Sequence, residues 1–145
     1  MKKTLLTIVI TLMAFCSFAQ WTTTAEGTKE LILDQNGDIR LVEQKDSSYD
    51  LVFSTTDSRF DYAQYFKLGK SKEEALQKAE MLKDAINNND VEKVNGKDAA
   101  GIDHQFKVDK PEGAKEPILL GHTAKAKGIW VLNLETIQKA IKALK

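Results

Sequence analysis

Alternating hydrophobic and polar residues in the first half of the chain predict a series of short β-strands. Residues 29–34 and 39–43 are β-type runs on either side of Asn36-Gly37, a dipeptide that accepts the positive φ angles of a tight hairpin turn. Two more alternating runs follow near residues 49–55 and 62–68. The first half is therefore predicted to be an antiparallel meander.

The hydrophobic spacing changes to a helical period at two places. Ser71 precedes Glu74 by three residues, the spacing at which each side chain can satisfy a free backbone N–H at a helix start. A helix is predicted from Lys72 to about Asn88. Its apolar stripe consists of Ala75, Ala79, Leu82 and Ile86. Asn133 is predicted to cap a second helix, which runs to the end of the chain.

Between these helices lie three further strand-like runs, at residues 102–108, 118–122 and 129–132, with glycine and proline in their connections. Strands before and between two helices are typical of the α+β class. We therefore expect one α+β domain over residues 29–145, built as an antiparallel sheet of about six or seven strands with two helices packed on one side.

The N-terminus has the pattern of a secretory signal peptide. Lys2 and Lys3 precede an apolar run that ends in the small residue Ala19, and the run is too short and too interrupted to be a favourable membrane span. Residues 1–19 are predicted to be removed before Gln20, which places the protein in the periplasm or outside the cell. A lipid anchor on Cys16 is the less favoured alternative, because bulky Phe15 precedes it.

Removal of the signal leaves 145 − 19 = 126 residues, the size of one domain, and no cysteine for a disulfide. Residues 20–28 are rich in threonine without periodicity and are predicted to be a flexible leader. The mature chain carries 19 basic and 21 acidic residues, because 2 of the 21 basic residues leave with the signal, so its formal charge is 19 − 21 = −2. This interleaved, balanced charge argues against binding to nucleic acid, and no membrane span is expected in the mature protein.

No catalytic motif stands out in the chain. Leu68-Gly69-Lys70-Ser71 lies between a strand and a helix, as a phosphate-binding loop would, but Gln64 stands where that loop needs its first glycine. The mature chain has no cysteine nucleophile and no Gly-x-Ser-x-Gly sequence. Nucleotide binding and nucleophilic catalysis are therefore not predicted.

The two histidines of the chain, His104 and His122, are the best candidates for a metal site. A symmetric hairpin that pairs Phe106 with Leu120 also places His104 opposite His122. Cross-strand neighbours have Cβ atoms about 5 Å apart, close enough for two imidazoles to hold zinc or a similar divalent metal if a third ligand is supplied. The structural alternative is a pair of partly buried, hydrogen-bonded core histidines.

Tyr65 is the candidate ligand-binding aromatic residue. Alternation places it on the strand face opposite Gln64 and Phe66. If that face is open, the ring could stack on a sugar or a partner; alternatively, it covers a sheet edge or lies beneath a loop.

Three functional hypotheses follow. The favoured one is a non-enzymatic exported module that binds a small ligand, a polymer or a protein partner. The alternative is a hydrolase or metal-dependent enzyme built around His104 and His122. A third possibility is an assembly component that pairs through an exposed strand edge.

Overall fold

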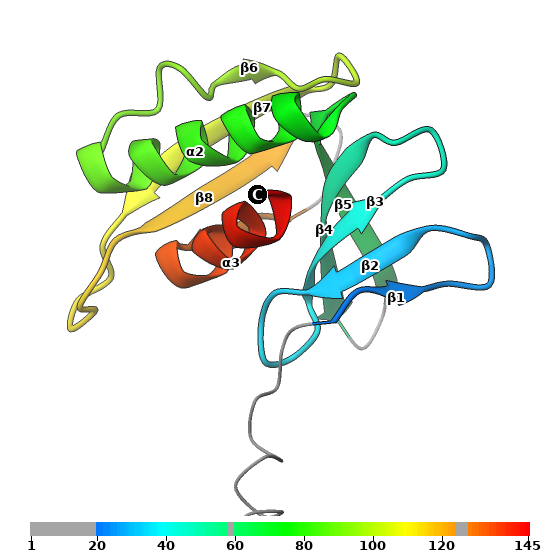
Figure 1. Cartoon of the computed structure of the whole chain (residues 1–145). Coiled ribbons are helices and arrows are strands. Elements are labelled where there is room, and N and C mark those ends of the chain that lie inside the picture. The colour runs from blue at the N-terminus through cyan, green and yellow to red at the C-terminus, as the bar shows by residue number, and fades with distance from the viewer. Residues whose placement is uncertain (1–19, 58–59, 124–127) are drawn as a thin grey trace, which may run out of the picture.

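The computed structural model describes residues 20–57, 60–123 and 128–145, so the predicted signal peptide lies outside the described residues. The first half contains only strands: β1 (Thr22–Thr23), β2 (Lys29–Ile32), β3 (Ile39–Glu43), β4 (Tyr49–Asp57) and β5 (Phe60–Gly69). The second half contains α2 (Lys72–Asn88), β6 (Gly96–Lys97), β7 (Asp103–Asp109), β8 (Ile118–Thr123), β9 (Trp130–Asn133) and α3 (Leu134–Leu144), as shown in Figure 1. This order of elements confirms the α+β class.

The single sheet expected from the sequence is wrong, because the strands form two antiparallel sheets. The five-stranded sheet has the order β1-β2-β3-β4-β5, and the four-stranded sheet has the order β6-β7-β8-β9. Each sheet is a meander, in which every strand pairs with its neighbour in the sequence. Helix α2 separates the two meanders along the chain.

The hairpin between β2 and β3 forms where the Asn-Gly pair predicts it. Gly37 has a φ of 76°, in the left-handed region that a glycine enters without a steric penalty. The Leu33 N–H donates to the Ile39 carbonyl at 2.9 Å, and the Asp34 carboxylate accepts from the Ile39 N–H at 3.0 Å. The connection is thus closed by one backbone and one side-chain hydrogen bond.

Residues 20–28 differ from the flexible leader expected from their composition. Thr22 and Thr23 pair with Glu30 and Lys29 as an added edge strand, and Gly27 turns the chain with a φ of 83°. Trp21 is partly buried against the hydrophobic core. The pairing with β2 and the burial of the Trp21 indole depend on contacts with other parts of the fold, so the Thr-rich composition of this segment does not predict them.

Both helices begin where the sequence predicts. The Ser71 side chain accepts a hydrogen bond from the Glu74 N–H at 3.2 Å, and the Asn133 side chain accepts from the Thr136 N–H at 2.8 Å. The reciprocal bond at α2 differs from the expected one, because Glu74 accepts from the N–H of Lys70, one residue before the cap. Each cap satisfies an N–H that has no partner inside its helix.

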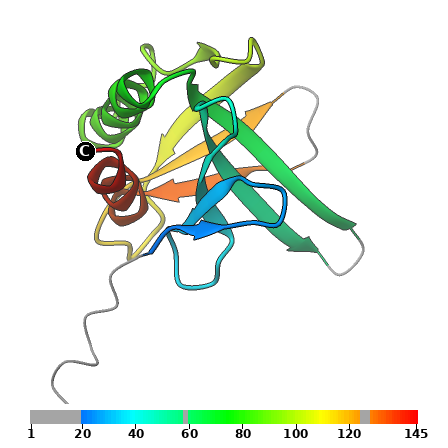
Figure 2. The same cartoon turned by 45° about the vertical axis from the view of Figure 1, so that its right-hand side comes forward.

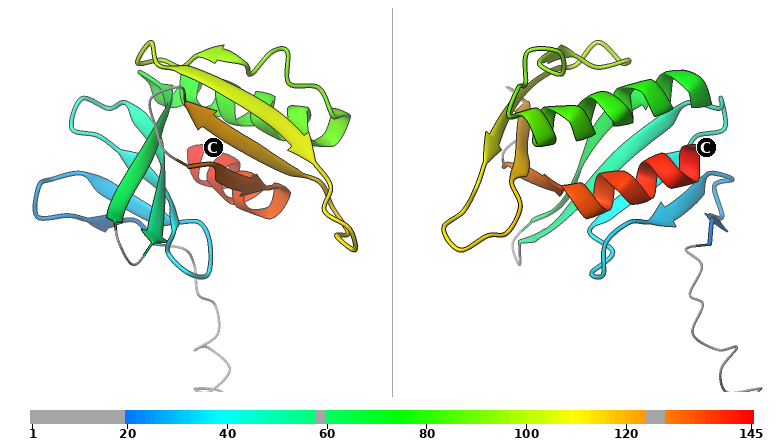
Figure 3. Two further views of the ribbon diagram at one scale, coloured as in Figure 1. Left: turned by 180° about the vertical axis from the view of Figure 1, so that it is seen from behind. Right: turned by 60° about the vertical axis from the view of Figure 1, so that its left-hand side comes forward.

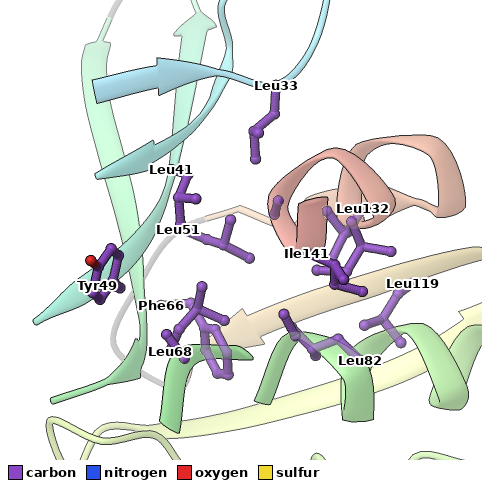
Figure 4. Packing of buried hydrophobic residues seen from close by; sticks show 14 of the residues in the cluster. Leu33, Leu41, Tyr49, Leu51, Phe66, Leu68, Leu82, Leu119, Leu132 and Ile141 are labelled. Carbon is purple, nitrogen blue, oxygen red and sulfur yellow. The ribbon is translucent and has the colours of Figure 1, made fainter. Parts of the chain in front are cut away.

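The two helices lie side by side and cover the same side of the strands (Figures 2 and 3). Between them and the sheets lies the core, in which Leu51 and Phe66 come from the five-stranded sheet, Leu132 from the four-stranded sheet and Leu82 from α2 (Figure 4). The apolar stripe expected on α2 is confirmed, because all four of its residues are buried. Among the described residues, neither helix has the length and apolar character needed to cross a membrane.

Candidate functional site

The predicted pairing of the two histidines is wrong by one residue. In the β7–β8 ladder, His104 lies opposite Thr123 and His122 lies opposite Gln105. His104 is completely buried on the inner face, whereas His122 is exposed. Successive side chains of a strand point to opposite faces, so this slip turns His122 away from the core and from His104. The structure therefore does not bring the two imidazoles together.

The register follows from how Gly121 and Trp130 fill the inner face. Gly121 lies opposite Phe106 on β7 and Trp130 on β9. A Cβ atom at Gly121 would lie 2.6 Å from Trp130 Cε2, so the indole occupies the space that a side chain would need. The apolar run Ile118-Leu119-Leu120 alternates equally well in either register, and the indole from β9 favours the observed one.

His104 forms a buried pair with Asp98 instead. Its Nε2 lies 3.1 Å from Asp98 Oδ2, and neither side chain is exposed to solvent. The same carboxylate accepts from the backbone N–H groups of Lys67 at 3.0 Å and of Ala100 and Ile102 at 2.9 Å each. Such a fully bonded carboxylate is the arrangement in which a buried charge is tolerated.

Asp98 joins the two sheets. Lys67 belongs to β5 of the five-stranded sheet, and its carbonyl also accepts from the Ala99 N–H at 3.3 Å. His104 belongs to β7 of the four-stranded sheet. The turn at residues 98–102 is closed by the Asp98 N–H, which donates to the Ile102 carbonyl at 2.9 Å. One carboxylate thus holds a sheet edge, a turn and a strand of the other sheet.

Aromatic rings surround the inner side of His104. Its ring centroid lies 4.7 Å from that of Phe66 in an edge-on arrangement and 6.1 Å from that of Phe106. Burial lowers the pKa of His104 below its usual value, and the hydrogen bond to the Asp98 carboxylate opposes this effect only in part. His104 is therefore fully buried, and folding disfavours its protonated form. Its Nδ1 has no hydrogen-bond partner in the described part of the chain.

Tyr65 lies on the opposite, outer face of the five-stranded sheet, and 54% of it is exposed. The register places it in one cross-strand row with Val52, Arg40 and Ile32, which we name the Tyr65 row. Ile32 at the other end of the row is 57% exposed, whereas Val52 is buried. Two exposed apolar side chains thus flank Arg40 and Val52 on an open sheet face.

Arg40 is held in place within the row. Its Nη1 donates to Glu30 Oε2 at 3.0 Å and its Nη2 to Ser54 Oγ at 3.1 Å. With both ends of the guanidinium bonded, the side chain is oriented without a ligand. The row therefore offers a fixed cation between Ile32 and Tyr65.

A polar cluster borders the Tyr65 row. Lys67, two residues from Tyr65 on the same face, donates to Ser48 Oγ at 2.9 Å and lies opposite Asp50 in the ladder. Burial raises the pKa of Asp50 above its usual value, although a hydrogen bond from Gln44 and the charge of Lys67 act in the opposite direction. Asp50 and Lys67 thus lie opposite one another in the ladder, and each has a hydrogen bond to a neutral side chain.

In the described ranges, no group of three or more His, Cys, Asp or Glu side chains is arranged to hold a metal ion. Sequence reasoning missed Asp98 and Arg40. A signal for Asp98 exists in Asp98-Ala99-Ala100-Gly101, because aspartate side chains accept N–H bonds from residues just beyond them in turns. Arg40 has no such local signal, since its partners lie on neighbouring strands.

No family model, no curated protein and no solved structure matches this chain.

Proposed function

We propose that this protein is exported and acts as a non-enzymatic module, which binds a ligand, polymer or protein partner through the Tyr65 row. The observation that carries the proposal is the position of Tyr65, 54% exposed on an open sheet face in line with the oriented Arg40. An exposed aromatic ring supplies stacking area, and an oriented guanidinium on the far side of Val52 in the same row supplies a positive charge. Aromatic and arginine side chains are the residue types that dominate binding surfaces.

Export is supported by the sequence of residues 1–19, with its basic start and small exit residue. Mass analysis of the N-terminus of the secreted protein tests it. A chain that begins at Gln20 is the expected result. Retention of residues 1–19, or a lipid on Cys16, would contradict this part of the proposal.

Binding is tested by titrating the mature protein with soluble oligosaccharides and with unstructured peptides. Amide chemical shifts should change around Tyr65 and Arg40 when a probe binds. Tyr65→Ala should weaken that binding by about 30-fold, since truncation of a central aromatic contact costs about 2 kcal/mol. Ile102→Ala is the matched control, because Ile102 is 44% exposed but precedes β7 in the other sheet.

Two outcomes would contradict the proposed surface. One is a bound probe whose shift changes map away from the Tyr65 row. The other is equal binding by the Tyr65→Ala and Ile102→Ala variants.

A further inference from the structure

Strand β9 lies at the edge of the four-stranded sheet. The pairing of β7 with β8 and of β8 with β9 shows which of its backbone N–H and C=O groups point away from the sheet. The Phe106 N–H donates to Asn95 Oδ1 at 2.6 Å, on the side of β7 that faces β6. Residues of an antiparallel strand alternate in the side to which they direct N–H and C=O. Gln105 and Lys107 therefore point toward β8, where they are the hydrogen-bonded partners of His122 and Leu120.

The same alternation continues into β9. Leu119 and Gly121 must point away from β7, toward their partners Leu132 and Trp130 on β9. Val131 consequently directs its N–H and C=O away from β8. Because β9 is the last strand of its sheet, these groups face an edge with no strand partner among the described residues (Figure 2).

The side chains at this edge are apolar and exposed. Val131 is 45% exposed on the outer face of the four-stranded sheet, and Ile129, the residue before β9, is 59% exposed. Natural edge strands often avoid pairing by carrying charged residues or proline. The segment from Gly128 to Asn133 has neither. The nearest cation in the row is Lys107, two strands away beyond Leu120.

We propose that this edge pairs with the same edge of a second copy of the chain, antiparallel about a two-fold axis at Val131. Each Val131 would donate to and accept from Val131 of the second copy. The N–H of Asn133 would donate to the Ile129 carbonyl of the second copy, while its own carbonyl belongs to helix α3. Two four-stranded sheets then become one continuous sheet.

A second copy fits this edge because the edge is complementary to itself. The two-fold axis places Val131 against Val131 on the outer face, and Leu120 extends this apolar row on each side. It keeps the two Lys107 side chains at opposite ends of the row, separated by the apolar residues. The mature chain has a formal charge of 19 − 21 = −2, which is too small to hold two copies apart.

The contact is small, because β9 has four residues. We therefore expect a transient dimer with a Kd on the order of 100 μM, in the range of small interfaces. Pairing at β9 leaves the Tyr65 row of the other sheet open. The dimer is thus independent of the proposed binding function.

The test is sedimentation equilibrium of the mature protein at concentrations below and above the expected Kd. Val131→Lys should abolish the dimer, since the two-fold axis would place two ammonium groups side by side. Val131→Glu should do the same. A 1:1 mixture of these two variants should restore it. Ile32→Lys is the matched control, because Ile32 is 57% exposed on the five-stranded sheet, and it should leave the dimer unchanged.

A measurement without substitutions accompanies this test. The Val131 amide should become protected from hydrogen exchange as the protein concentration rises. A wild-type protein that stays monomeric at ten times the expected Kd would overturn the proposal. So would a dimer that survives Val131→Lys, a dimer that Ile32→Lys abolishes equally, or a mixture of the charged variants that remains monomeric.

Discussion

Replacement of Gly121 by alanine tests the β7–β8 register directly. A Cβ atom at this position would lie 2.6 Å from Trp130 Cε2 and 2.7 Å from Cη2, both inside the closest approach of carbon atoms. Trp130 cannot retreat easily, because it is 2% exposed and its ring stacks on Phe53 with centroids 4.1 Å apart. The backbone of Gly121 is not in the left-handed region, so the added methyl group is the source of strain.

We expect Gly121→Ala to lower the free energy of unfolding by about 1–3 kcal/mol, the cost of overpacking a well-filled core. In urea, with a slope of about 2 kcal/mol per molar, the midpoint should fall by roughly 1 M. Unfolding followed by far-ultraviolet circular dichroism measures this without relying on the fluorescence of Trp130.

The control is the same substitution in a Trp130→Phe background. The smaller ring relieves the contact, so Gly121→Ala should cost less there by about 1 kcal/mol, a coupling typical of residues in contact. If β8 had the register expected from the sequence, with His122 opposite His104, Gly121 would face solvent. Alanine would then be neutral or stabilising, and that result would refute the packing described here.

Three further substitutions probe other parts of the structure. Leu82→Ala should cost about 2–5 kcal/mol in urea unfolding, because Leu82 is 0% exposed in the core and its loss leaves a cavity; an unchanged midpoint would place α2 outside the core. The pKa of His104 is lowered in the folded state, so the unfolded state takes up its proton first, and stability should fall as the pH drops below about 6.5. A His104→Gln variant should lack that slope, and an unaltered pH profile would contradict the assignment. The pKa of Asp50 is raised, so folding disfavours its ionised form. Asp50→Asn should therefore raise the free energy of unfolding above that of the wild type at pH 7, and this gain should be smaller near pH 3, where Asp50 is protonated in the wild type too. Lower stability of this variant at pH 7 would show that the attraction of Lys67 outweighs the burial of the carboxylate.

Local patterns were sufficient to predict the elements that local interactions stabilise. Helix α2 begins after the capping Ser71 and ends at Asn88, as predicted, and its C-cap Asn89 adopts the left-handed conformation with a φ of 53°. The β2–β3 hairpin forms around Gly37. In both cases the deciding contacts lie within a few residues of one another, so the sequence contains the information in one short window.

The candidate site was predictable only in part. Tyr65 is exposed on the face opposite Phe66, as alternation within β5 requires, because side-chain direction along one strand depends on parity alone. The oriented Arg40 in the same cross-strand row was not predictable. It depends on the register of three strands, which the residues of β5 do not specify.

The sequence by itself therefore determined the helices, most strand positions and the parity of side chains within each strand. Only the tertiary structure decided how the strands divide into two sheets and how β7 pairs with β8. The indole of Trp130 occupies the space above Gly121, and this contact favours the register that turns His122 away from the buried His104. The Asp98 carboxylate then joins His104 to the edge of β5. Both decisions rest on contacts between residues far apart in the chain, whose energies appear only when the strands have come together.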